Sequence, residues 1–135
     1  MAYKISDIEG IGPVISEKFA EVGIKTVEGL LEKGASKKGR DELAAATGMD
    51  ASKILVFVNN ADLFRVKGVS SQYAELLKAS GVDTVKELRN RKPENLHAKM
   101  KEVNEEKNLV RQVASLSQVE GFVNHAKELE PKVTH

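Results

Sequence analysis

Apolar residues recur along this chain at the spacing of α-helices, and no stretch alternates long enough to predict a strand. Ile15, Phe19 and Val22 lie three or four positions apart, between Pro13, which suits a first helical position, and Gly23, which suits a helix end. Later segments repeat this pattern, so we expect an all-α fold. Residues suited to helix starts stand at Thr26, Ser36 or Gly39, Asp50, Ser70, Thr84, Pro93 and Ser117.

Two finer features follow from the same pattern. Thr84 with Glu87, and Ser117 with Glu120, have the spacing of capping boxes. The helix that Asp50 begins carries many apolar residues, so we expect a central buried helix over about residues 51–66 that runs directly into Gly68.

The hydrophobic pattern also repeats. Ile8–Leu30 can be laid over Val66–Leu88 at an offset of 58 without a gap, and the six identical pairs are Gly10/Gly68, Glu17/Glu75, Gly23/Gly81, Thr26/Thr84, Val27/Val85 and Leu30/Leu88. The sequence Phe-Val-Asn-Asn-Ala at 57–61 matches Phe-Val-Asn-His-Ala at 122–126. We therefore predict one unit used twice, over residues 1–63 and 64–135. The second copy is seven residues longer between its glycine and phenylalanine anchors, and we place the irregular stretch between Asn104 and Ser115.

Composition narrows the function classes. The chain has 135 residues, no cysteine and only three scattered histidines, so we expect neither disulfides nor a metal centre built from side chains, and no cofactor. No apolar run approaches the roughly 20 residues that cross a bilayer. The first nine residues are mixed and charged, unlike a secretory signal. We expect a cytoplasmic protein with no membrane partner.

The net charge of +1 gives no global argument for a polyanionic partner, but its distribution is uneven. Residues 1–63 hold 8 Lys/Arg against 10 Asp/Glu, a net of −2, whereas residues 64–135 hold 13 against 10, a net of +3. The stretch Lys86–Lys101, which includes Arg89, Arg91 and Lys92, has a local net charge of +4. This run is a candidate for polyanion contacts, and a solvated helix face is the alternative.

The stretch Ile8-Glu9-Gly10-Ile11-Gly12-Pro13, followed by Phe19, resembles the hairpin of the helix-hairpin-helix family. Glycines there allow positive φ and let a phosphate approach the backbone, while the N–H groups that start the next helix form an anion site. The resemblance implies phosphate binding by the amides of Gly10, Gly12, Val14 and Ile15, with Lys18 one turn further on. It also implies that the carbonyls of Ser6, Ile8 and Ile11 can hold a monovalent cation. The same turn also serves as a purely structural joint between helices.

The second hairpin, Val66-Lys67-Gly68-Val69-Ser70, departs from this signature. Ser70 replaces the second glycine, and we expect its hydroxyl to compete for the amides that a phosphate would need. The flanks Arg65 and Lys67 are basic, whereas Glu9 beside the first hairpin is unfavourable for a phosphate. The first hairpin thus has the better backbone for a phosphate site, and the second has the more favourable charge.

Over nearly its whole length, Ile5 to Leu129, the chain resembles a prokaryotic family of duplicated helix-hairpin-helix proteins known only as a domain of unknown function. The stretches that carry this resemblance are Thr26–Glu28, Lys37–Leu43, Ala61–Phe64, Asn95–Ala98 and Val103–Lys107. It implies two tandem helix-hairpin-helix repeats packed as one compact helical unit that shares the long central helix. It implies no particular activity.

We consider three functions for this sequence. The first is non-sequence-specific binding of nucleic acid, double-stranded DNA or another structured form, in which hairpin amides and the nearby residues Arg65, Lys67, Gly68, Ser70, Arg89, Arg91 and Lys92 contact phosphates. The alternative is a protein-interaction or scaffold module that keeps the fold without binding DNA. An enzyme is disfavoured, because the sequence shows no nucleophile with a base, carboxylate pair or metal site.

Overall fold

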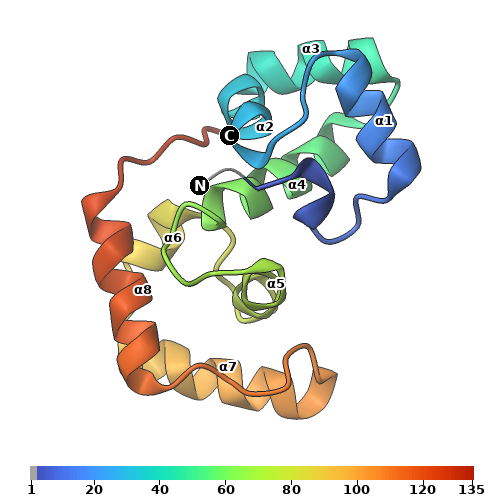
Figure 1. Cartoon of the computed structure of the whole chain (residues 1–135). Helices are drawn as coiled ribbons and strands as arrows, with labels where there is room; N and C mark the ends of the chain where they lie inside the picture. The colour runs from blue at the N-terminus through green and yellow to red at the C-terminus, as the bar shows by residue number, and fades with distance from the viewer. Residues whose placement is uncertain (1–2) are drawn as a thin grey trace. The chain divides into compact units, whose positions relative to one another are not determined.

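The structure, a computed structural model that describes residues 3–135, is all-helical. This confirms the predicted fold class; Met1 and Ala2, with which the predicted first half begins, lie outside the described residues. In chain order (Figure 1) the elements are the 3-10 helix η1 (Ile5–Asp7) and the α-helices α1 (Pro13–Glu21), α2 (Val27–Gly34), α3 (Lys37–Thr47), α4 (Ala51–Leu63), α5 (Ser71–Ala79), α6 (Val85–Arg89), α7 (Pro93–Lys107) and α8 (Leu116–Glu128).

The chain divides into two compact units. The first unit comprises the residues up to Asp62 together with Lys132–His135, and the second unit comprises Leu63–Pro131. In the first unit α2 packs on α3, and η1 contacts α1 and α2. In the second unit α8 packs on α6 and α7, and α5 packs on α7.

Each unit has a core of aliphatic residues with one central phenylalanine contact. In the first unit Phe19 of α1 meets Phe57 of α4 edge to face, with ring centroids 6.3 Å apart. In the second unit the ring of Phe122 on α8 lies 6.1 Å from that of Tyr73 on α5. The four phenylalanines of the chain are all buried, as expected for core residues.

Local capping explains several of the helix starts. The side-chain oxygens of Thr26, Ser36 and Thr84 accept hydrogen bonds from N–H groups three residues on, at 3.0, 3.0 and 3.3 Å. These three starts agree with the sequence. The irregular stretch of the second unit lies at residues 108–115, within the predicted range, and Asn108 adopts a left-handed conformation there.

Two predicted boundaries are wrong. The central helix ends at Leu63 rather than about residue 66, because the chain turns at 64–68 and thereby buries both Val66 and Val69. The last helix is capped by Ser115, not Ser117. Ser115 Oγ accepts a hydrogen bond from Gln118 N–H at 3.2 Å, and Gln118 Oε1 accepts one from Ser115 N–H at 2.8 Å, which together form a capping box. Ser117 and Glu120 have the same three-residue spacing, which is why the sequence pointed to them instead.

Candidate functional site

The first glycine turn, residues 8–12, joins η1 to α1. Ile8 and Ile11 are buried, and Ile11 N–H donates to the Ile8 carbonyl at 3.1 Å, which closes the turn. Gly10 between them has φ +91°, a conformation that L side chains rarely adopt. A Cβ on Gly10 would stand 3.4 Å from the ring of Phe57. Because the Ile8 carbonyl already accepts this bond, a cation at the carbonyls of Ser6, Ile8 and Ile11 would have to share that oxygen.

The second glycine turn, residues 66–70, joins α4 to α5 and has the same backbone. Val69 N–H donates to the Val66 carbonyl at 3.1 Å, and Gly68 has φ +90°. A Cβ on Gly68 would stand 3.0 Å from Cε1 of Phe122. Positions 58 residues apart in the sequence therefore have matching conformations and matching phenylalanine neighbours.

Each turn leads into a helix whose first N–H groups carry no side-chain cap. In α1 the first intrahelical bond runs from Ser16 to Gly12 at 2.9 Å, so the amides of Val14 and Ile15 precede it. In α5 the first such bond runs from Ala74 to Ser70 at 2.8 Å. The Ser70 hydroxyl accepts no capping bond, so the expectation that it competes for these amides is wrong. Its backbone is extended, as it is at Thr26, Ser36 and Thr84, which do cap their helices.

The flanks of the two turns differ in charge. Glu9 beside the first turn is exposed, and Asp7 accepts a hydrogen bond from Lys4 N–H at 3.1 Å. Lys18 is half-buried in the last turn of α1. Lys67 beside the second turn is exposed, and so is Lys92, the N-cap residue of α7.

The predicted arginines are already engaged with main-chain carbonyls of the second unit. Arg65 donates to Glu130 at 2.6 Å, Arg91 to Gly81 at 2.8 Å, and Arg89 to Lys127 at 3.4 Å. Arg91 also lies 3.8 Å from the Glu87 carboxylate. A guanidinium carries five N–H donors, so a bond to one carbonyl positions such a side chain without using every donor.

Sequence analysis missed a groove beside the second turn. Lys67 N–H donates to Nδ1 of His125 at 2.9 Å, which ties the turn to α8. The groove encloses about 490 Å³ and is lined by Lys67, Gly68, Gln118, Gly121, Phe122, Asn124, His125 and Glu128. The hydrogen bond between residues 67 and 125 depends on how α8 packs, which the local sequence does not determine. The one sequence signal near the groove was the Asn-His motif at 124–125.

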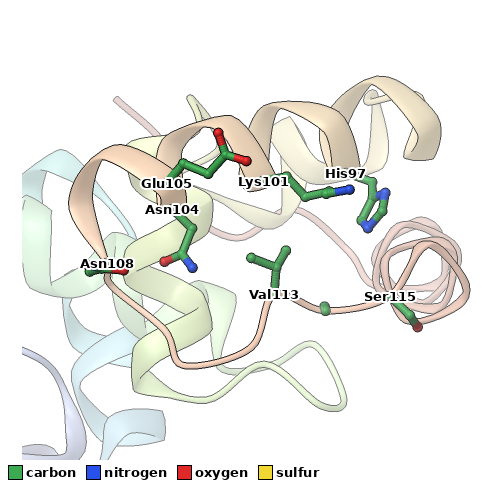
Figure 2. Close-up of a pocket in the computed structure, with 8 residues that line it drawn as sticks. His97, Lys101, Asn104, Glu105, Asn108, Val113 and Ser115 are labelled. Carbon is green, nitrogen blue, oxygen red and sulfur yellow. The ribbon is translucent and has the colours of Figure 1, made fainter.

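A second cavity of about 410 Å³ lies between α7 and the 108–115 loop (Figure 2). Asn104 points toward that loop and holds it with two bonds, from Nδ2 to the Val110 carbonyl and from Val110 N–H to Oδ1, both 3.0 Å. Ser115, at the far end, caps α8. These two polar side chains of the wall stabilise the loop, and the lining also includes His97, Lys101, Glu105, Asn108, Val113 and Ala114.

Arg40 in α3 was not expected to be buried. It is only 4% exposed and donates to the carbonyls of Gly34 and Ala35 at 2.9 and 3.0 Å, and to that of Thr134. Thr134 N–H donates in turn to the Ala35 carbonyl at 2.8 Å. Burial lowers the pKa of Arg40, and the charge of Asp41 partly offsets this by raising it. Arg40 thus fastens the C-terminal segment to the first unit.

The described part of the chain offers neither a metal-binding cluster nor a membrane-spanning helix. Within residues 3–135, no three His, Asp or Glu side chains gather in a way that could hold a metal ion. In the same range, no helix is both long and apolar enough to cross a bilayer.

Residues 9–129 match the family described as a domain of unknown function, DUF4332, and the chain therefore belongs to this family. No curated protein matches the chain. No solved structure matches it either.

Proposed function

We propose that this chain is a non-sequence-specific nucleic-acid-binding module whose ligand is double-stranded DNA, and that its two glycine turns are tandem helix-hairpin-helix hairpins. In this proposal the uncapped amides that begin α1 and α5 hold backbone phosphates. The role is binding without catalysis.

The observation that carries the proposal is the uncapped first turn of both helices. Backbone N–H groups at a helix start point outward and lie at the positive end of the helix dipole, which favours an anion. Gly12 offers no side chain, and a Cβ built on it meets nothing within 4 Å, so the approach to α1 is open. Ser70 leaves the corresponding amides of α5 uncapped.

Charge favours the second turn as the stronger phosphate site. Lys67 is exposed beside Gly68. Arg65, two residues before Lys67, is positioned by its hydrogen bond to the Glu130 carbonyl. Contacts to phosphate release counterions, so the logarithm of the affinity should fall with the logarithm of salt concentration by about 0.9 per phosphate neutralised. With Lys18, Arg65 and Lys67 as the nearest cations, we expect a slope of about −3.

The test uses substitutions that block the amides without harming the helices. Asp is a better N-cap than Gly, and its carboxylate both accepts from the first-turn amides and repels phosphate. We expect Gly12→Asp and Ser70→Asp to weaken binding to a short duplex, measured by fluorescence anisotropy at low salt, while the melting temperature is unchanged or higher. Gly12→Ala and Ser70→Ala are the neutral controls. Equal affinity of the Asp variants and their Ala controls would contradict the proposal.

A protein-interaction module is the second candidate, and one observation favours it. Val14, at the open face of the first turn, is 68% exposed, and Glu9 adds a negative charge nearby. Burial of this exposed valine against a partner would remove apolar surface from water, which favours association. Self-association of the wild type in sedimentation experiments, lost in Val14→Ser and accompanied by no DNA binding, would support this candidate over the first.

A further inference from the structure

The groove beside the second glycine turn has both apolar and polar residues in its lining. Gly68 and Gly121 contribute backbone only, and the ring of Phe122 lies against Gly68. A Cβ built on Gly121 meets nothing within 4 Å, so the surface above this residue of α8 is open. The volume of about 490 Å³ falls within the usual range of small-molecule sites.

The rim carries both hydrogen-bond donors and hydrogen-bond acceptors. Gln118 and Asn124 carry amides that both donate and accept, Lys67 donates, and Glu128 accepts. Nδ1 of His125 accepts the Lys67 N–H, so a neutral imidazole carries its proton on Nε2 and donates from there. This mixture suits a planar heterocycle with donors and acceptors around its edge.

The first unit has different residues at the matching positions. When the phenylalanine anchors Phe57 and Phe122 are aligned, Val56 stands where the second unit has Gly121, and Leu63 stands where it has Glu128. Val56 is 36% exposed, so a side chain occupies the surface that Gly121 leaves open. The groove is therefore a property of the second copy and is not required by the turn itself.

We propose that this groove binds a nucleobase, that of a nucleotide whose phosphate lies at the amides of the second turn. The proposal rests on the proposed function, since it uses the same turn for the phosphate. Lys67 and Gly68 belong to both the turn and the groove, so the groove adjoins the turn at which the phosphate is proposed to bind. Bases present a planar face to an apolar wall and donors and acceptors at their edges, whatever their sequence. The nucleotide is either free or an unpaired residue of a nucleic acid strand.

The test is a substitution at Gly121 that places a side chain in the groove. Gly121→Leu places a side chain over the open surface of α8, and Gly121→Ala is the control for the change in backbone. We titrate the full chain with the four nucleoside 5′-monophosphates and with ribose 5-phosphate, and follow binding by NMR chemical shifts. At least one nucleotide should bind about tenfold more tightly than ribose 5-phosphate. Gly121→Leu should abolish this advantage, leave ribose 5-phosphate binding unchanged and retain the helical circular dichroism, and Gly121→Ala should retain the advantage.

The outcomes separate the two proposals and the two sources of the base. Nucleotide affinities equal to that of ribose 5-phosphate, or an advantage that survives Gly121→Leu, would overturn the groove proposal while duplex binding at the turns still stands. Failure of the wild type to bind any duplex refutes the proposed function instead. A duplex with one bulged nucleotide that binds more tightly than a fully paired one, with the difference lost in Gly121→Leu, identifies an unpaired strand residue as the source. A preference for free nucleotides with no such difference identifies the mononucleotide.

Discussion

Substituting Gly68 with alanine tests how the second glycine turn is built. Gly68 has φ +90°, so alanine must adopt a left-handed backbone, which costs about 1–2 kcal/mol. Its Cβ would also stand 3.0 Å from Cε1 of Phe122, closer than side chains normally pack. Phe122 is 4% exposed and packs against Tyr73, so its ring must shift by a few tenths of an ångström, and overpacking of this kind costs about 1–3 kcal/mol more. We expect Gly68→Ala to lower the free energy of unfolding by about 2–5 kcal/mol.

Two other glycines provide the controls for this number. Gly48, which ends α3, has φ +76° and no atom within 4 Å of a built Cβ, so Gly48→Ala should show the backbone cost alone. Gly10 has nearly the same φ as Gly68 but a longer distance of 3.4 Å to Phe57, so Gly10→Ala should fall between the two. The order of destabilisation is therefore Gly68 first, Gly10 second and Gly48 last.

Urea unfolding followed by far-UV circular dichroism measures these differences, and hydrogen exchange of the α5 and α8 amides reports the second unit separately. In a Phe122→Leu background the extra cost at Gly68 should shrink toward the value for Gly48→Ala. If Gly68→Ala costs no more than Gly48→Ala in the wild-type background, the close contact between the turn and Phe122 is not what fixes its shape.

Three further predictions test the packing within each unit. Arg40→Met removes the guanidinium donor from three carbonyls and should lower the free energy of unfolding by about 2–4 kcal/mol. Because a guanidinium stays protonated in proteins, this loss should be constant between about pH 5 and 9, which urea titrations at several pH values check. Gly34→Ala places a Cβ 2.5 Å from Cγ2 of Val58 and should destabilise by at least about 2 kcal/mol, whereas Gly121→Ala, in open space within α8, should stabilise by about 0.5–1 kcal/mol. A melting temperature of Gly34→Ala that is not below that of the wild type would contradict the packing of Gly34. Asn104→Ala removes both bonds to Val110 and should raise hydrogen exchange in the 108–115 loop with a stability loss of about 1–3 kcal/mol, and unchanged exchange of the Val110 amide would refute this role.

Local sequence signals predicted much of the fold. The 3.6-residue spacing identified the helices, and Thr26, Ser36 and Thr84 cap them through side-chain bonds that span only three residues. The glycine turn pattern indicated the positive φ at Gly10, and Gly68 at the repeated position shares this conformation. The same expectation is wrong for Gly12, which is extended with φ −93° as the N-cap residue of α1.

Features that depend on distant residues could not be predicted in this way. Nothing in the local sequence marks Arg40 as buried, because its carbonyl partners include Thr134, 94 positions away. Lys67 meets His125 across 58 positions, and the groove beside them exists only because α8 places Gly121 and Phe122 there. The arginines that local charge indicated as phosphate contacts turned out to be held by carbonyls of distant residues, Glu130 and Lys127 among them.

The most direct test of phosphate binding at the glycine turns is an NMR titration of the ¹⁵N-labelled chain with a short DNA duplex at low salt. We predict the largest amide shifts at Val14 and Ile15 in α1 and at Ser71 and Gln72 in α5, with affinity that falls as salt is added. Shifts confined to other surfaces, or no shifts at all, would contradict the account.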